Sequence, residues 1–155
     1  MNDKKRSGGT TMRLTAAIKY AITAVLYVGL KSREEHISPS KYIKIKEISR
    51  QCGITHNHLI KVIHRLGKSD IIITMRGKSG GVMLGKELFD ISIADVIRVF
   101  YDETTLKINE TFYNDVLFTL QVPLVDAQRS YLKTLDQVSF ESLVKELDDH
   151  LKMSY

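Results

Sequence analysis

The segment from Thr55 to Leu66 concentrates side chains that can form hydrogen bonds. Its apolar residues recur at spacings of three and four, at Leu59, Val62, Ile63 and Leu66. This spacing predicts a helix with one buried face, and Thr55 is suited to cap its first turn. Other positions of this segment carry polar side chains, namely His56, Asn57, His58, Lys61, His64 and Arg65. Donors of these types meet phosphate oxygens and base edges, so this helix is suited to contact nucleic acid.

A second basic segment has the sequence Arg76-Gly77-Lys78-Ser79-Gly80-Gly81. It lies between two strand-prone stretches, Ile71–Thr74 and Val82–Leu84, and so predicts a β-hairpin with a basic tip. Its glycines would let the backbone approach a duplex, where Arg76 or Lys78 meets negative potential. A Walker-type phosphate loop is the alternative, but that loop leads into a helix and this one leads into a strand.

Further elements must position these two segments. The run around Ile45 and Ile48 predicts a short helix that stops at Gly53, where a positive φ permits a sharp reversal. Together with the following helix it forms the outline of a helix-turn-helix. Ahead of it, helical spacing of apolar residues predicts a first helix, capped by Thr15 and ending near Leu30.

The back of the chain also predicts helices. Ser92 with Asp95 forms a cap pair for a helix that reaches Phe100, and Ser139 can cap a last helix. Between them an amphipathic helix is expected over Leu124–Leu135. The predicted fold class is therefore mainly α with a small β-hairpin wing, a winged helix-turn-helix followed by a long C-terminal helix.

Composition and charge restrict the class of protein. The 155 residues have a net charge of +5. Residues 1–90 hold 17 Lys and Arg against 7 Asp and Glu, whereas residues 91–155 hold 6 against 11. A basic front half suggests a polyanionic partner. No apolar run reaches the roughly 18 residues of a membrane span, and the polar N-terminus lacks a signal peptide, so we expect a cytoplasmic protein with no membrane contact.

Three motifs together resemble the IscR/NsrR/CymR family of bacterial winged helix-turn-helix transcriptional regulators. They are the start Met12-Arg13-Leu14-Thr15, the helix-turn-helix with Leu59 and Leu66, and the wing from Arg76 to Leu84. The likeness is specific from Met12 to about Asp102 and looser beyond it. It implies a DNA-binding domain at residues 12–90 and a helical effector and dimerisation region at residues 91–155. Residues 1–11 would be a flexible tail or an added extension.

The resemblance also implies a partner. A homodimer would place two recognition helices on a palindromic operator in double-stranded DNA, with half-sites about one DNA turn apart. Asn57 would be suited to adenine at the start of the recognition helix. The expected DNA-binding residues are Arg13, Thr55, His56, Asn57, His58, Lys61, Arg65, Arg76, Lys78, Ser79 and Gly80. We expect binding there to repress transcription by blocking promoter access.

Many members of this family hold an iron-sulfur cluster with three cysteines after the helix that contains Val96 and Phe100. In this chain residues 103–128 contain no cysteine, and Cys52 is the only cysteine of the sequence. The non-cysteine ligand that some members take from the first helix would fall at Lys19, whose ammonium group does not ligate iron. We therefore expect no cofactor and a different signal.

Other sources of that signal stay open. Cys52 is a candidate redox thiol, although a small buried residue is also expected beside Gly53. A metal could bind the histidines of the recognition helix, for which DNA contact or solvation is the alternative: His56, His58 and His64. A small-molecule effector could bind among aromatic residues that otherwise form core: Tyr101, Phe112, Tyr113 and Phe118. A protein effector is the fourth option.

The sequence also bears on two other classes of protein. No catalytic triad, paired carboxylates or metal-ligand spacing is present in the sequence, so we do not expect an enzyme. The competing class is a protein-interaction or nonspecific nucleic-acid-binding architectural module. Such a module would recover no palindromic motif when bound DNA is collected genome-wide.

Overall fold

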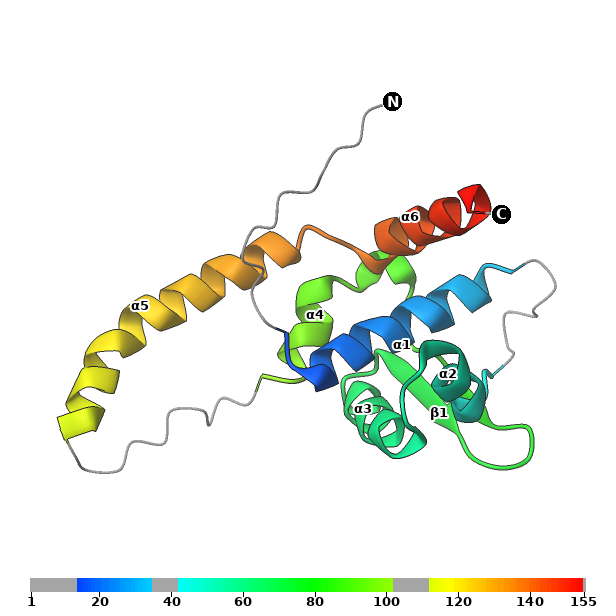
Figure 1. Ribbon diagram of the computed structural model, residues 1–155, viewed down its shortest axis with the longest axis horizontal. Coiled ribbons are helices and arrows are strands. Elements are labelled where there is room, and N and C mark those ends of the chain that lie inside the picture. The colour runs from blue at the N-terminus through cyan, green and yellow to red at the C-terminus, as the bar shows by residue number, and fades with distance from the viewer. Residues whose placement is uncertain (1–13, 35–41, 102–111, 155) are drawn as a thin grey trace.

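The computed structural model describes residues 14–34, 42–101 and 112–154 (Figure 1). Its elements are α1 (Ala16–Ser32), α2 (Ile45–Cys52), α3 (His56–Lys68), β1 (Ile72–Met75), β2 (Gly81–Leu84), the 3-10 helix η1 (Leu88–Asp90), α4 (Ile93–Arg98), α5 (Phe112–Leu135) and α6 (Phe140–Met153). Helices around one hairpin confirm the predicted fold class. Over these residues, every helix is too short or too polar to cross a lipid bilayer.

Helix α1 is the central element, and it contacts α2, α3, β2, α4 and α6. As expected, the Thr15 hydroxyl caps it and accepts a hydrogen bond from the Ile18 amide at 3.3 Å. Its buried face is rich in small residues, which lets neighbouring elements approach closely. At Gly29 a Cβ atom would lie 2.8 Å from Leu88 Cδ2 and 2.9 Å from Val144 Cγ2. The absence of a side chain there allows η1 and α6 to pack on α1.

Helices α2 and α3 form the predicted helix-turn-helix. Gly53 ends α2 with φ of 64°, the left-handed conformation expected for this turn. The Ser49 hydroxyl reinforces the turn by donating to the Ile54 carbonyl at 2.6 Å. Helix α3 buries the four apolar residues that its spacing indicated, Leu59, Val62, Ile63 and Leu66.

Strands β1 and β2 form the predicted antiparallel wing, in a register that pairs Ile72 with Leu84 and Met75 with Gly81. Strand β2 of the wing also pairs with a residue that precedes α2. Ile43 and Val82 exchange two backbone hydrogen bonds of 2.8 Å, so the wing is joined to the start of the helix-turn-helix. This joint sets where the wing lies relative to α3.

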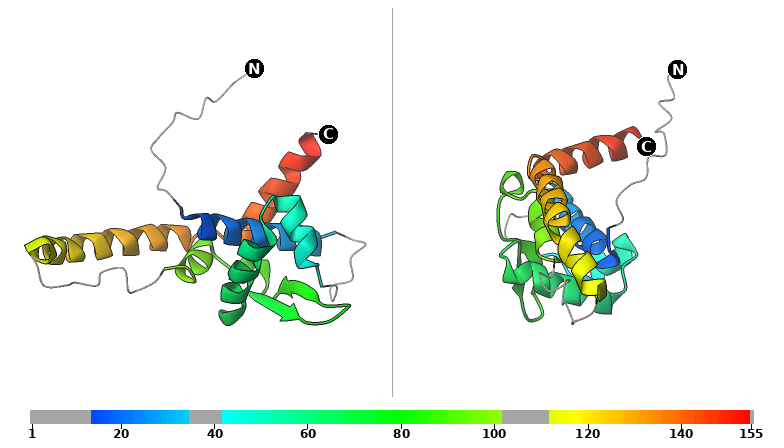
Figure 2. Two further views of the ribbon diagram at one scale, coloured as in Figure 1. Left: turned by 60° about the horizontal axis from the view of Figure 1, so that its bottom comes forward. Right: turned by 90° about the vertical axis from the view of Figure 1, so that its left-hand side faces the viewer.

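Helices α5 and α6 lie differently relative to α1. Helix α6 turns back over α1, whereas α5 extends away from the body of the molecule (Figures 1 and 2). The buried core includes Val96 and Phe140, so it crosses the proposed boundary at residue 90, and that division remains a prediction.

Two helix ends differ from the sequence-based expectation. Helix α4 ends at Arg98, before Phe100. Helix α5 begins at Phe112, well before Leu124, and continues through Pro123. A proline ends a helix in most sequence patterns, but within a longer helix it removes only one donor and bends the chain locally.

Candidate nucleic-acid interface

The exposed face of α3 carries the polar side chains that the sequence singled out. His56, Asn57, Lys61 and His64 are all exposed, while the opposite face of the helix is buried. Sequence reasoning missed Ile60, which is 44% exposed on this otherwise polar surface. Ile60 lies outside the buried spacing of α3, and that departure was the signal that could have revealed it. An exposed apolar side chain on such a face can meet a thymine methyl group.

Thr55 occupies the N-cap position of α3, but its side chain does not cap the helix. Instead its hydroxyl oxygen lies 3.0 Å from Nδ1 of His58. The His58 ring also stacks on Tyr20 of α1, with ring centroids 6.0 Å apart. His58 is therefore placed between α1 and the start of α3, where it can brace the helix as well as face a ligand.

At the tip of the wing, Arg76, Lys78 and Ser79 are exposed, whereas Gly80 is buried. The Lys44 ammonium group donates to the carbonyl oxygens of Lys78 at 2.5 Å and of Gly80 at 2.6 Å. Sequence reasoning did not single out Lys44, because nothing near it in the sequence indicates a contact with the wing. Gly80 thus contributes its backbone to the shape of the tip, and Lys44 holds that shape.

A groove of about 500 Å³ separates α3 from the wing. Helix α3 lines one side of it with His56, Ile60 and His64, and the wing lines the other with Met75 and Arg76. Lys44 and Lys46 border the same groove from the start of α2. Of the predicted contacts, His56, Arg76 and Gly80 line this groove, and three basic residues border it: Lys44, Lys46 and Arg76.

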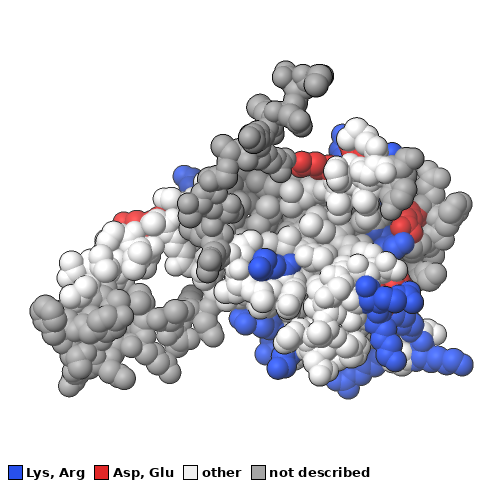
Figure 3. Space-filling model, in the orientation of Figure 1, with Lys and Arg blue, Asp and Glu red and all other residues white. Residues whose placement is uncertain are grey.

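The charge pattern of this region favours an anionic ligand. No acidic residue occurs in the sequence between Glu47 and Asp70, or between Asp70 and Glu87. Figure 3 shows Lys and Arg gathered over the part of the molecule that carries the helix-turn-helix and the wing, with acidic side chains mainly elsewhere on this face. A concentrated positive surface of this kind attracts phosphate groups.

The structure places Arg65 away from this surface. Its guanidinium group donates to the Val99 carbonyl oxygen at 2.7 Å and lies over the Phe100 ring, 4.6 Å from its centroid. Arg65 is half-buried at the far end of α3. The sequence grouped it with the DNA contacts because helical spacing places it near Lys61, but in the structure one of its donors is bonded to the end of α4.

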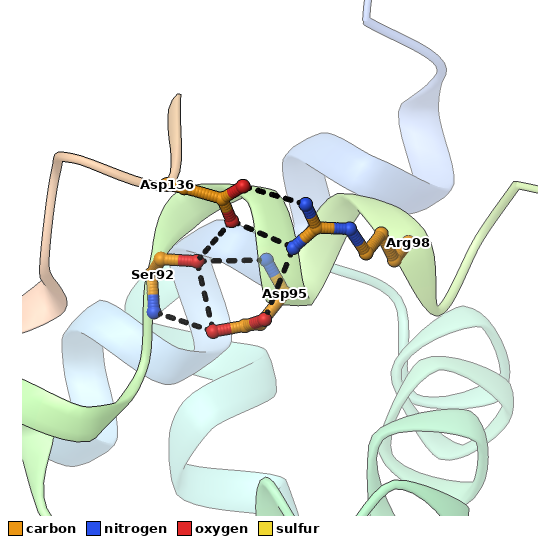
Figure 4. Close-up of polar contacts among 4 residues, drawn as sticks. All are labelled: Ser92, Asp95, Arg98 and Asp136. Atoms are coloured by element: carbon orange, nitrogen blue, oxygen red, sulfur yellow. Dashed lines mark hydrogen bonds and ion pairs between the residues drawn. The ribbon is translucent and has the colours of Figure 1, made fainter. Parts of the chain in front are cut away.

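A polar cluster joins α4 to the end of α5 (Figure 4). Ser92 and Asp95 form the predicted capping box, and Arg98 donates to both carboxylate oxygens of Asp136 at 2.7 Å. Hydrogen bonding from Arg98 lowers the pKa of Asp136, and Asp136 in turn raises the pKa of Arg98. The same junction has backbone hydrogen bonds from Ile93 to Val138 and from Phe140 to Ile91.

The other candidate groups are dispersed. Cys52 is half-buried against the core, and burial raises the pKa of its thiol, which lowers the thiolate fraction at neutral pH. Among residues 14–34, 42–101 and 112–154 there is no group of three or more His, Cys, Asp or Glu side chains that could hold a metal ion, so the histidines of α3 do not form one. Arg13 lies outside the described residues, as do the side chains of Phe112, Tyr113 and Phe118.

A helix-turn-helix followed by a basic hairpin defines the winged-helix class of DNA-binding proteins. Within that class, residues 14–146 match the model of the Rrf2 family, described as an iron-dependent transcriptional regulator. The chain therefore belongs to the Rrf2 family of transcriptional regulators.

Relatives and solved structures agree with this assignment. The chain is 31% identical over 145 residues to the HTH-type transcriptional regulator NsrR of Shouchella clausii, covering 89% of this chain and 92% of that protein. It is 31% identical over 149 residues to NsrR of Bacillus subtilis, covering 92% and 97%. These relatives are named as regulators and not as enzymes, and the protein is not an enzyme.

The fold is similar to that of two solved regulators. IscR of T. potens superposes with a TM-score of 0.66 at 20% identity, covering 93% of this chain and 97% of that one. CymR of B. subtilis, titled the global cysteine regulator, has a TM-score of 0.61 at 20% identity, covering 88% and 98%.

The iron named in the family description does not fit the donors of this chain. A cluster is held mainly by cysteine thiolates, and the sequence has only Cys52, which packs against the core from α2. Lys19, where an additional ligand was expected from the resemblance, is exposed on α1 and carries an ammonium group.

Proposed function

We propose that this protein is a homodimer that binds a palindromic operator and represses transcription, in response to a signal other than an iron-sulfur cluster. The observation that carries the proposal is the continuous surface formed by the exposed face of α3 and the basic wing. Its side chains offer hydrogen-bond donors, and no acidic residue interrupts it between Glu47 and Asp70. Such a surface supports insertion of α3 into a major groove.

Base reading would come from the first turns of α3. The Asn57 side chain is exposed, and an asparagine amide can form two hydrogen bonds with adenine. Ile60 follows one turn later and is suited to a thymine methyl group. His56 and Thr55 lie at the start of the same helix, where its amide groups and dipole favour a phosphate.

Backbone contacts would come from Lys61 on α3 and from the wing. Arg76 borders the groove between the two elements, and Lys78 and Ser79 are exposed at the tip. An arginine on a wing is suited to a phosphate or to a narrow minor groove. These contacts would set affinity and register, while α3 sets sequence preference.

Dimerisation through α5 is supported by its exposed apolar side chains. Val116, Leu120 and Leu124 recur every four residues and are 44%, 45% and 53% exposed. Helix α5 extends beyond the body of the molecule, so this stripe is open to a second copy (Figure 2). A symmetric pairing would bury the stripe and place two α3 helices on one side of a duplex.

Repression and the signal form the last part of the proposal. A dimer on an operator blocks the promoter when the two overlap. The donors of this chain do not fit a cluster, so the signal would be another small molecule, a protein or a modification of Cys52.

Collection of DNA bound by the protein in its host, followed by sequencing, tests the proposal. A palindromic motif that the purified protein binds with a ratio of at least about 10³ over random DNA would support it. No enriched motif, with weak binding to every sequence, would favour the architectural module instead. The same purified dimer should lose operator binding when Asn57 and Lys61 are both replaced by alanine.

A further inference from the structure

Arg65 connects the recognition helix to the end of α4. Its guanidinium group donates to the Val99 carbonyl oxygen at 2.7 Å and lies over the Phe100 ring at 4.6 Å. Val99 follows the last residue of α4, and a carbonyl at the end of a helix has no partner within the helix. The cationic guanidinium supplies that partner, and the half-buried setting makes the contact stronger than an exposed one.

Arg98, the residue before Val99, forms a contact with the end of α5. Arg98 pairs with Asp136, which follows the last residue of α5, through two bonds of 2.7 Å (Figure 4). Adjacent residues therefore attach the end of α4 to α3 on one side and to the end of α5 on the other. Ile93 and Val138 join the start of α4 to the same turn through a backbone bond of 3.0 Å.

We propose that Arg65 is a positioning residue. It fixes the orientation of the recognition helix α3 relative to α5, and the connection runs through residues 98–100. The inference rests on the proposed function, because it assigns α3 to DNA and α5 to the dimer. A displacement of α5, or of the end of α4, would be transmitted to α3 by the Arg65 contact. Arg65 therefore influences operator affinity without touching DNA.

A salt titration separates this role from a phosphate contact. We expect Arg65→Ala to lower operator affinity about tenfold, within the usual range of coupling between sites, while the slope of log affinity against log salt stays that of the wild type. Lys61→Ala is the matched control, and it should reduce that slope by about one. A reduced slope in Arg65→Ala, or an unchanged affinity, would overturn the inference.

Conservative variants protect the test against misfolding. Arg65→Lys keeps a cationic donor and should recover part of the lost affinity, whereas Arg65→Met keeps an apolar stem over Phe100 but removes the donors. Circular dichroism at the assay temperature checks that each variant is folded. If Arg65→Lys and Arg65→Met bind equally well, the bond to Val99 does not position α3 and the inference fails.

A double-mutant cycle tests the connection to α5. Asp136→Asn removes the charged partner of Arg98, so it should lower operator affinity in the protein that retains Arg65. In the Arg65→Ala background the same substitution should change the logarithm of the affinity by at most half as much. Strictly additive effects would overturn the coupling.

Hydrogen exchange without DNA gives an independent readout. Asp136→Asn should speed exchange of the α3 amides only when Arg65 is intact, and unchanged exchange in both backgrounds would contradict the coupling. This result does not depend on an operator, so a wild-type protein that binds none would refute the proposed function and leave the contact testable.

Discussion

The Nζ atom of Lys44 lies 2.5 Å from the backbone oxygen of Lys78, although 34 residues separate the two lysines. A second bond, of 2.6 Å to the Gly80 oxygen, makes Lys44 a clamp on the tip of the wing. One basic residue therefore determines the shape in which others are presented. Lys44 also borders the groove between the wing and α3, so its positive charge lies close to that groove.

Lys44→Met should loosen the wing tip. The change keeps the aliphatic stem and removes two charge-assisted hydrogen bonds, so we expect operator affinity to fall by about 1 to 2 kcal/mol. Amide exchange at residues 77–80 should become faster. Lys46→Met is the matched control, since Lys46 borders the same groove but has no hydrogen bond to the wing among the described residues. If the two variants lose the same affinity and exchange their amides at the same rate, Lys44 contributes to binding only through its charge and not through its hydrogen bonds to the wing.

Asn57→Ala should relax sequence specificity. Loss of a two-bond contact with adenine should weaken the free energy of binding to the operator by about 1 to 3 kcal/mol. It should weaken binding much less for operators that are changed at that base pair. Competition binding with single-base operator variants measures this directly. A uniform loss on every sequence would instead assign Asn57 to the DNA backbone.

Arg76→Ala should weaken binding on all sequences and reduce the slope of log affinity against log salt by about one, because the proposed contact of Arg76 with phosphate would release counterions without reading bases. Arg129→Ala provides the control, since it also removes one positive charge but lies on α5 beside Asp126. An unchanged slope for Arg76→Ala would remove that side chain from the interface.

Leu124→Glu should convert the proposed dimer into monomers, because it places a charge in the apolar stripe of α5. Light scattering after size exclusion gives the mass, and operator affinity should fall by at least about 3 kcal/mol when one half-site is lost. Arg129→Gln changes the net charge equally on another face of α5 and should remain dimeric. A dimeric Leu124→Glu protein would place the interface elsewhere.

Asp136 should make stability depend on pH. Its pKa is held below the ordinary value of about 3.9 by the hydrogen bond from Arg98, so folding favours the ionised form. That contribution is present above the unfolded pKa and is lost as the pH falls through the folded pKa.

Denaturant unfolding of the wild type and Asp136→Asn at several pH values measures this effect. The wild type should be the more stable protein at neutral pH, and the difference should shrink on acidification below about pH 4. Asp126→Asn, which breaks a pair within one helix turn of α5, should change stability less at neutral pH. A difference that stays constant with pH would mean that the charge of Asp136 is not what stabilises the junction.

Local patterns in the sequence determined most of the fold. The caps at Thr15, Ser92 and Ser139, the reversal at Gly53 and the glycine-rich wing were all predictable. Each depends on residues within a few positions of one another, because turns, caps and helical spacing are set by local backbone geometry. The exposed polar face of α3 followed from the same spacing.

Only the tertiary structure decided which basic side chains of α3, and of the residues that flank the wing, are bound to other parts of the chain. Arg65 and Lys61 occupy similar places on α3 by sequence, yet Arg65 is bound to Val99, and Lys44 is bound to the wing. Arg98 and Asp136 are 38 residues apart and meet only after α4 and α5 have packed. Such contacts depend on the relative placement of whole elements, which the buried core fixes and which side-chain spacing along one helix does not encode.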